Sequence, residues 1–295
     1  MTKGNAFFNF LRGIIIWTSL DRYFTYLTKG SLSTSILGRL APNNYQYKKG
    51  TYRSVQTKNN IKLSLDLHDY LGHYIYFGYK DPSQEALLNI VEEDYFVFDI
   101  GTNIGNTILE LANKVKPGGK VIGFEPDPET YGYCLKNIEL NKFENVQVHN
   151  IGLGDCNSSF FIENRIESNS GGNRINENLT DGIKQVKVKV LDDIFSEFHI
   201  KKLNLMKIDV EGYEMKVLLG AKNIIQKYKP KLFIEIDDNN LKDQKSSAQQ
   251  LIKFLEENYY DCIDAVSKRQ ITSNDDFSNC HFDIICFHEK PELEN

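Results

Sequence analysis

The sequence predicts an α/β protein with a mostly parallel central sheet, an antiparallel C-terminal hairpin and a small N-terminal extension. Short apolar runs typical of buried strands alternate with longer amphipathic segments, as parallel sheets require. The first of these runs ends in a glycine-rich turn. With 295 residues, 41% of them hydrophobic, the chain can bury a sizeable core. The net charge of -5 gives no reason to expect a nucleic-acid partner.

Residues 1–50 are predicted to form an N-terminal helical extension. Residues 6–20 are largely apolar, but they contain Asn9, Arg12 and Gly13 and are fewer than the roughly 20 residues of a membrane span. We therefore expect a helix that packs on the core or in a dimer interface. Peripheral membrane attachment, with Trp17 as an interfacial anchor, is the alternative.

Residues 51–90 are predicted to form a small β-hairpin and a lid region that leads into the core. Apolar residues recur at every second position from Ile61 to Leu67, which is the period of a half-buried strand. Residues 70–78 are rich in aromatic residues and glycine, and we expect a lid or a wall of the substrate pocket. His73 in this segment is interpreted as a structural histidine or as a catalytic base.

Residues 91–295 are predicted to form the main domain, preceded by a helix over residues 84–91. We expect strands at 95–100, 120–125, 146–151, 205–210 and 231–235, with helices beginning near Asn106, Thr130, Met215 and Ser247. Residues 260–265 and 282–287 are the candidates for the antiparallel hairpin. Small polar residues between 156 and 181 favour a mobile or disordered surface loop.

The turn after the first core strand predicts a ligand site. Asp99 ends the apolar run, and Gly101 and Gly105 follow just before a helix. Glycines let a backbone approach a ligand closely, and a helix N-terminus offers unpaired N–H groups. The spacing is not the dinucleotide pattern GxGxxG, and Asp99 would repel a pyrophosphate. A sulfonium-bearing amino acid with an ammonium group suits the turn better.

The second core strand ends in an acidic residue, Glu125, twenty residues beyond Gly105. An acid at the tip of the second strand of a βαβ unit is placed to accept hydrogen bonds from ribose hydroxyls. Glu125 is therefore the candidate ribose ligand.

Charged residues also end the fourth core strand. Strand alternation points Lys207, Asp209 and Glu211 to one side. One interpretation is an ion pair of Lys207 with either acid that orders the turn; the other is contact of Asp209 or Glu211 with cofactor or substrate. Asp209, Glu211 and Glu235 are also the natural ligands for a divalent metal, which is a minor alternative and is not expected.

The five cysteines form no CxxC pair, and their odd number argues against a complete disulfide framework. Ordinary buried thiols are favoured over a metal site at Cys280, His281 and Cys286. We therefore expect the protein in a reducing compartment, the cytoplasm. Peripheral attachment to a membrane is the alternative localisation.

With these segments in view, the chain resembles the FkbM family of S-adenosylmethionine (SAM) dependent methyltransferases. The resemblance covers about residues 70–236. It rests on FDIGTNIGNT, GFEPDP, NIGLGD, VKVLDDIF, MKIDVEGYE and KPKLFIEI in that order. It implies a Rossmann-like class I methyltransferase fold, SAM as cofactor and O-methylation of hydroxyls of sugars, polysaccharide components or polyketides. The family often has alanine where this chain has Thr102.

The resemblance also implies roles for particular residues. Asp209 is the first candidate for the general base, Glu211 the second, and His73 and Glu235 follow. Aligning acceptor and methyl donor supplies most of the acceleration in such a displacement. The implied cofactor-binding residues are Asp99, Gly101, Thr102, Asn103, Gly105, Asn106, Thr107, Glu125, Pro126, Asn150, Ile151, Gly152 and Asp209.

Two other functions stay open at this point. The βαβ unit with an acid on its second strand is shared with NAD-dependent oxidoreductases, and a non-catalytic accessory protein that binds SAM or a glycan is the second alternative. The expected partner is a small-molecule or glycan hydroxyl acceptor, without nucleic acid. A membrane or dimer contact would involve residues 6–20.

Overall fold

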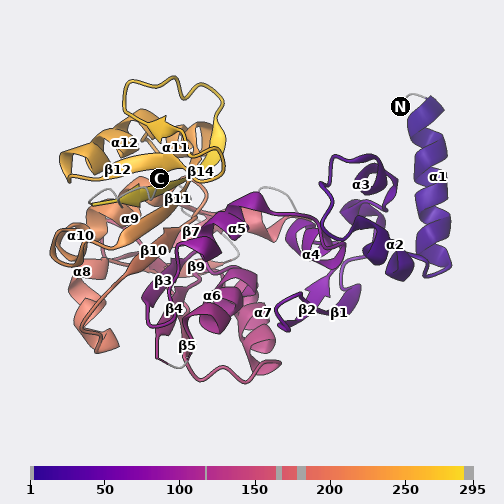
Figure 1. Ribbon diagram of the computed structural model, residues 1–295, viewed down its shortest axis with the longest axis horizontal. Helices are drawn as coiled ribbons and strands as arrows, with labels where there is room; N and C mark the ends of the chain where they lie inside the picture. The colour runs from indigo at the N-terminus through magenta and orange to yellow at the C-terminus, as the bar shows by residue number, and fades with distance from the viewer. Residues whose placement is uncertain (1–2, 117, 164–167, 178–183, 289–295) are drawn as a thin grey trace, which may run out of the picture. The chain divides into compact units, whose positions relative to one another are not determined.

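The computed structural model describes residues 3–116, 118–163, 168–177 and 184–288. The chain divides into two compact units (Figure 1). Unit 1 comprises Met1–Pro82 and Asn164–Gly172, and unit 2 comprises Ser83–Glu163 and Asn173–Asn295. The divisions at residues 50 and 90 stay predictions.

Unit 1 combines short helices with one β-hairpin. Its elements are α1 (Lys3–Trp17), α2 (Asp21–Thr28), α3 (Ile36–Leu40), η1 (Asn44–Gln46), β1 (Tyr52–Gln56), β2 (Lys62–Asp66), α4 (Tyr70–Tyr76) and η2 (Ser170–Gly172). β1 and β2 pair in antiparallel fashion, which confirms the predicted hairpin. The aromatic segment after it is helix α4, because the Asp69 side chain accepts hydrogen bonds from the amides of Leu71 and Gly72.

Unit 2 is built on an eight-stranded sheet of order β13-β12-β14-β11-β10-β3-β4-β5. Its strands are β3 (Phe96–Ile100), β4 (Lys120–Phe124), β5 (Val146–His149), β10 (Leu205–Ile208), β11 (Lys231–Asp237), β12 (Asp261–Asp264), β13 (Gln270–Ile271) and β14 (His281–Phe287). The strands from β11 to β5 in this order are parallel, whereas β14 is antiparallel to β11 and β12. The predicted mostly parallel sheet with an antiparallel C-terminal hairpin is confirmed.

Helices connect the parallel strands, as the sequence predicted. The connecting helices are α6 (Asn106–Val115), α7 (Pro128–Glu139), α8 (Leu191–Ile194) with η3 (Phe195–Phe198), α9 (Glu214–Gly220) and α10 (Lys222–Tyr228). α5 (Pro82–Asn89) precedes β3, and α11 (Asp238–Asp243) and α12 (Ala248–Glu257) lie between β11 and β12. α7 begins two residues before the predicted Thr130, because Asp127 caps it and Pro128 occupies its first position.

A second sheet corrects the prediction of a loop over residues 156–181. Within that stretch lie β7 (Ser158–Glu163) and β8 (Arg174–Asn176), which join β6 (Gly152–Leu153) and β9 (Gln185–Lys189) in the order β6-β9-β7-β8. Ile162 and Ile175 lie directly opposite each other and are buried. The short run Phe160–Ile162 and the single Ile175 stand among many small polar residues, and the sequence analysis gave the polar composition more weight than this strand signal.

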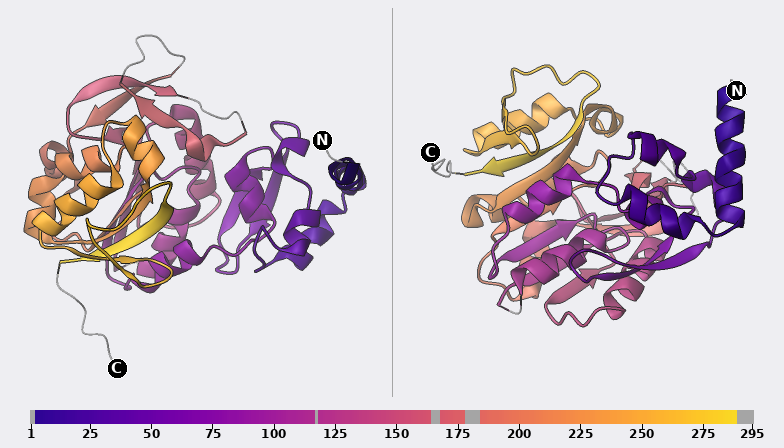
Figure 2. Two further views of the ribbon diagram at one scale, coloured as in Figure 1. Left: turned by 90° about the horizontal axis from the view of Figure 1, so that it is seen from above. Right: turned by 45° about the vertical axis from the view of Figure 1, so that its right-hand side comes forward.

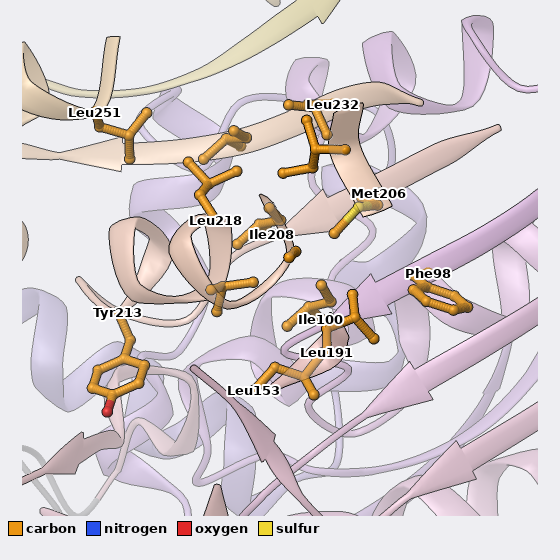
Figure 3. Packing of buried hydrophobic residues seen from close by; sticks show 14 of the residues in the cluster. Phe98, Ile100, Leu153, Leu191, Met206, Ile208, Tyr213, Leu218, Leu232 and Leu251 are labelled. Carbon is orange, nitrogen blue, oxygen red and sulfur yellow. The ribbon is translucent and has the colours of Figure 1, made fainter. Parts of the chain in front are cut away.

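The core of unit 2 surrounds the central strands (Figure 3). Phe98 and Ile100 of β3, Met206 and Ile208 of β10 and Leu232 of β11 are at most 1% exposed. Consecutive residues of β3 and β10 are buried, so both faces of these strands are covered and their apolar residues do not alternate with exposed polar ones. Close packing on both faces holds fixed the strand ends from which the site is built.

No helix in the described residues has both the length and the apolar character needed to cross a bilayer.

Candidate active site

The turn between β3 and α6 has a backbone that only glycine fits at two positions. Gly101 has φ +85°, and a Cβ there would lie 1.8 Å from the Asp209 carbonyl oxygen. Gly105 has φ +92°, and a Cβ there would lie 2.9 Å from Cys134 Sγ. Asn103, between them, also has a positive φ. The turn is thus pressed against the end of β10 on one side and against α7 on the other.

Glu125, the candidate ribose ligand, is tied to this turn. Its Oε2 accepts a hydrogen bond from the Asn103 amide at 2.9 Å, and its Oε1 accepts one from the Asp127 amide at 3.0 Å. Burial raises the pKa of Glu125 to about 7, although these two backbone donors oppose the shift. One carboxylate therefore fixes the turns after β3 and β4 relative to each other.

The end of β5 joins the same edge. Asn150 donates from Nδ2 to the backbone oxygens of Glu125 at 2.8 Å and Pro126 at 3.0 Å. Gly152, in β6, packs so closely that a Cβ would lie 2.9 Å from Ile175 Cδ1. The three turns predicted to bind cofactor thus lie at the carboxyl edge of neighbouring parallel strands, where ligands of open α/β sheets bind.

Lys207 connects this edge to the carboxylates of the central strand. Its Nζ lies 3.0 Å from Asp209 Oδ2 and 3.5 Å from Asp99 Oδ1, and it donates to the Gly101 carbonyl at 3.0 Å. Burial alone lowers the pKa of Lys207, but Asp209 and Asp99 outweigh it and raise the pKa above the usual value. The predicted ion pair of Lys207 with Asp209 is present, and Asp99 is a second partner.

Asp99 is fully buried, and neither of its carboxylate oxygens accepts a hydrogen bond from the residues that the structure describes. Burial raises its pKa to about 6, with Lys207 opposing the shift. The carboxylate therefore depends on one ammonium group for its charge compensation.

Three carboxylates converge beside Lys207. One oxygen each of Asp209, Glu211 and Glu235 lies within 4.8 Å of the others. Asp209 has 40% of its side chain exposed, whereas Glu235 has 17%. Burial, with Asp209 and then Glu211 as the nearest negative charges, raises the pKa of Glu235 well above its usual value. Three carboxylates this close together can share a proton. Their oxygen atoms are also of the type that binds hard divalent cations.

The turn that places Glu211 is shaped by residues that the sequence analysis did not single out. Glu214 Oε1 accepts hydrogen bonds from the amides of Val210 and Gly212, both at 3.0 Å. Asn240 donates from Nδ2 to Glu211 Oε2 at 2.8 Å. An acid at the first position of a helix, following a glycine turn, is the signal that could have identified Glu214.

Other predicted site residues have supporting positions. Thr102 is buried and donates from Oγ1 to the Asp99 carbonyl at 3.0 Å. Asn106, which opens α6 beside Thr107, donates from Nδ2 to Gln84 Oε1 at 3.3 Å. Among the predicted site residues, Asn150 is exposed, and Gly101, Asn103, Thr107, Pro126, Ile151, Asp209, Glu211 and Glu235 are part-exposed.

His73 belongs to unit 1, where its ring is buried. Its Nε2 lies 2.7 Å from the Pro42 carbonyl oxygen, and burial lowers its pKa to about 4. It packs on Phe77 with ring centroids 4.7 Å apart. These contacts are those of a structural histidine, and its catalytic role stays a prediction.

The sheet order and the glycine turn define a Rossmann-like α/β domain, the class predicted from the sequence. Residues 99–262, more than half of the chain, match the methyltransferase FkbM domain. The chain belongs to the FkbM methyltransferase family, which confirms the predicted resemblance.

Individual relatives carry methyltransferase names. Methyltransferase 1 of Beauveria bassiana is 33% identical over 147 residues, covering 43% of this chain and 59% of that protein. Hexuronic acid methyltransferase AglP of Haloferax volcanii is 28% identical over 140 residues, covering 48% of this chain and 55% of that protein. 2-O-methyltransferase NoeI of Sinorhizobium fredii is 22% identical over 188 residues, covering 57% and 74%. The chain spans a little over half the length of the first two relatives.

Proposed function

We propose that this chain is a SAM-dependent methyltransferase that O-methylates a hydroxyl of a sugar, glycan or polyketide-like acceptor. The observation that carries the proposal is the linkage of Glu125 to the glycine turn through the Asn103 amide. That linkage puts the ribose candidate and the turn for the methionine end at one sheet edge, beside the carboxylates of Asp209, Glu211 and Glu235.

The residues at this edge fit SAM. Each oxygen of Glu125 accepts one backbone hydrogen bond, and a carboxylate oxygen has a further lone pair for a ribose hydroxyl. Gly101 and Asn103 are part-exposed, so the turn backbone is within reach of the methionine end. Asn150 and Ile151 would border the adenine. When bound, SAM supplies a methyl group made electrophilic by its sulfonium sulfur.

An alcohol acceptor must lose a proton, and the carboxylate cluster is suited to accept it. Asp209 is the more exposed acid and would contact the acceptor, while Lys207 keeps it oriented. Burial and the neighbouring acids raise the pKa of Glu235, which makes its ionised form the stronger base of the cluster. We therefore assign Asp209 to the acceptor hydroxyl and Glu235 to holding the proton, with Glu211 as the third member.

The names of two relatives support a sugar hydroxyl as acceptor. AglP is named for a hexuronic acid and NoeI for a 2-O position. A carbohydrate hydroxyl is also compatible with a site rich in acceptor oxygens, because carboxylates bind sugar hydroxyls through hydrogen bonds.

The cofactor is tested by calorimetric titration of the whole chain with S-adenosylhomocysteine, SAM and NAD. Glu125→Ala removes the proposed ribose ligand, and Glu139→Ala, at the exposed end of α7, is the matched control. We expect the parent chain to bind S-adenosylhomocysteine. Glu125→Ala should weaken this binding by about 10- to 100-fold, and Glu139→Ala should leave it unchanged. Preference for NAD, or absence of binding, would refute the proposal.

Turnover is tested by release of S-adenosylhomocysteine from SAM with a panel of uronic acids and other sugars. Asp209→Asn should lose turnover and retain cofactor binding, whereas an accessory protein would show no turnover in either form. Activity should persist in the presence of a chelator, because Lys207 already supplies a cation beside Asp209. Loss that Mg²⁺ restores would assign the carboxylates to a metal instead.

A further inference from the structure

We propose that unit 1 carries a surface for peripheral attachment to an anionic membrane. This N-terminal surface consists of the exposed apolar side chains Phe10, Ile14 and Trp17 of α1 and Tyr23 and Tyr26 of α2, together with exposed basic residues of the same unit. It is independent of the proposed methyl transfer.

Exposed large apolar side chains are concentrated at the N-terminus. Of the eighteen in the described part of the chain, twelve lie between Phe8 and Tyr45. Single exposed apolar residues are ordinary, but such a concentration marks an interaction surface.

On α1 three of the exposed apolar residues lie along one stripe, whereas Phe8 lies off it. Phe10, Ile14 and Trp17 are 66%, 40% and 86% exposed, and they recur at the four- and three-residue spacing of one helix face. Trp17, the only tryptophan, is thus almost fully exposed at the C-terminal end of the helix. Figure 2 shows α1 as a straight helix that continues into α2 at this end.

On α2 the opposite face is already occupied. Asp21 and Thr28 are fully buried, and Thr28 Oγ1 donates to the Phe77 carbonyl at 2.6 Å. Tyr23 and Tyr26 are 69% and 80% exposed on the other side. Because α2 is anchored through its buried face, the aromatic face is held outward. Amphipathic aromatic rings of this kind favour the membrane–water interface.

The net positive charge of residues 1–50 favours an anionic partner for this surface. Residues 1–50 contain seven Lys or Arg and one acid, which gives a formal charge of +6. The whole chain has 35 basic and 40 acidic residues, so residues 51–295 carry a formal charge of -11. The one acid, Asp21, is fully buried and lies 3.8 Å from Arg53. The exposed basic side chains include Arg22, Lys29, Arg39 and Lys49. Exposed charge in residues 8–50 is thus positive.

An anionic lipid surface fits this combination better than a second copy of the chain. A two-fold interface would bring the same positive region against itself, which is repulsive. Aromatic residues beside Lys and Arg are the signature of a helix that lies in the interface of an anionic bilayer. α1 has 15 residues, fewer than the roughly 20 needed to span, so the surface would lie on the membrane.

The proposal is tested by co-sedimentation of the full chain with vesicles of phosphatidylcholine alone or mixed with an equimolar amount of phosphatidylserine. We expect binding to the mixed vesicles that falls at high salt and little binding to phosphatidylcholine. The double variant Arg22→Glu/Lys49→Glu should weaken binding at least about tenfold, given about 1 kcal/mol per basic residue at the surface. Trp17→Ser should weaken it by a similar factor.

Matched variants in unit 2 control for general loss of charge or aromatic surface. Tyr259→Ser replaces a side chain that is 79% exposed, and Lys222→Glu/Lys253→Glu reverses two exposed charges. They should leave vesicle binding unchanged, and circular dichroism should show equal melting temperatures for all variants. The proposal is overturned by absence of binding to the mixed vesicles or by equal binding to both compositions. A dimer that Trp17→Ser dissociates, or binding of a mixed-sequence RNA in place of vesicles, would also overturn it.

Discussion

At the scale of single residues, the ammonium group of Lys207 organises the candidate site. It lies within 3.5 Å of two carboxylates, Asp99 and Asp209, and also donates to the Gly101 carbonyl. Among the described residues, neither Asp99 oxygen has a hydrogen-bond donor within normal limits, and the ammonium group of Lys207, 3.5 Å away, compensates its charge. Loss of this cation would leave a buried charge unpaired, which is far costlier than loss of a surface ion pair.

Lys207→Met should therefore lower the free energy of unfolding by about 3–5 kcal/mol at neutral pH. Lys202→Met, which removes a cation from an exposed pair with Asp94, should cost less than about 1 kcal/mol. Urea denaturation of both variants measures the difference. The loss for Lys207→Met should shrink as the pH falls toward about 6, because removal of the ammonium group raises the pKa of Asp99 further and its buried carboxyl then takes up a proton. Equal, small losses in both variants would contradict the role given to Lys207.

If Glu125 binds the cofactor as proposed, we expect cofactor binding to depend on pH. Its pKa is raised to about 7, and ribose hydroxyls donate best to the ionised form. Affinity for S-adenosylhomocysteine should rise about tenfold between about pH 6 and pH 8, following the ionised fraction. Calorimetry at both pH values measures the change, and in Glu125→Gln the dependence should disappear. An unchanged slope in that variant would assign the titration to another group.

At the scale of elements, the site depends on a turn that presses against β10. Gly101 has a positive φ, and a Cβ at this position would overlap the carbonyl oxygen of Asp209. The sequence predicted glycine there for close approach to a ligand, and the structure adds a close approach to the protein's own backbone. The turn proposed to bind cofactor and the backbone of Asp209 are thereby in direct contact.

Gly101→Ala should destabilise the protein by on the order of 2–5 kcal/mol through strain and overlap, and should weaken cofactor binding. Gly132→Ala is the matched control, because a Cβ at this position in α7 meets nothing within 4 Å. It should stabilise the protein by about 0.5–1 kcal/mol, as alanine does in a helix. Thermal and urea unfolding test both, and a neutral Gly101→Ala would refute the steric argument.

At the scale of the whole molecule, buried acids set the response of stability to pH. Burial raises the pKa of Glu214 and of Glu125 to about 7, and that of Asp99 to about 6. A raised folded-state pKa gives stability that is fully present below the unfolded pKa and is lost as the pH rises through the folded pKa. These groups therefore favour the folded state at about pH 4.5 relative to pH 8.

Glu214→Gln tests this response with little change of shape. Glutamine keeps an oxygen that can accept from the Val210 and Gly212 amides, but it cannot ionise. The variant should lose less stability than the parent when the pH rises from about 5 to 8, by about 1–3 kcal/mol. Melting curves at the two pH values measure this difference. Identical pH dependence would mean that Glu214 ionises normally in the folded state.

The sequence by itself determined the layout of the core. Long apolar runs predicted each parallel strand to within about two residues at most boundaries, because strands covered on both faces need no alternation. The glycine spacing, Asp99 and Glu125 identified the turns, and the ordered motifs identified the FkbM family, since these features are local in the chain. The strands β7 and β8 were missed because their pairing depends on Ile162 meeting Ile175 across a polar insertion.

Only the tertiary structure decided which charged groups act together. Asp209 and Glu211 come from the end of β10 and Glu235 from β11, and their convergence within 4.8 Å follows from the parallel pairing of those strands. The sharing of Lys207 between Asp99 and Asp209, and the roles of Glu214 and Asn240, likewise depend on contacts between segments distant in the chain. Local sequence patterns determine the strands and turns. Burial and neighbouring charges determine the pKa values of the buried groups, and both depend on how distant segments pack together.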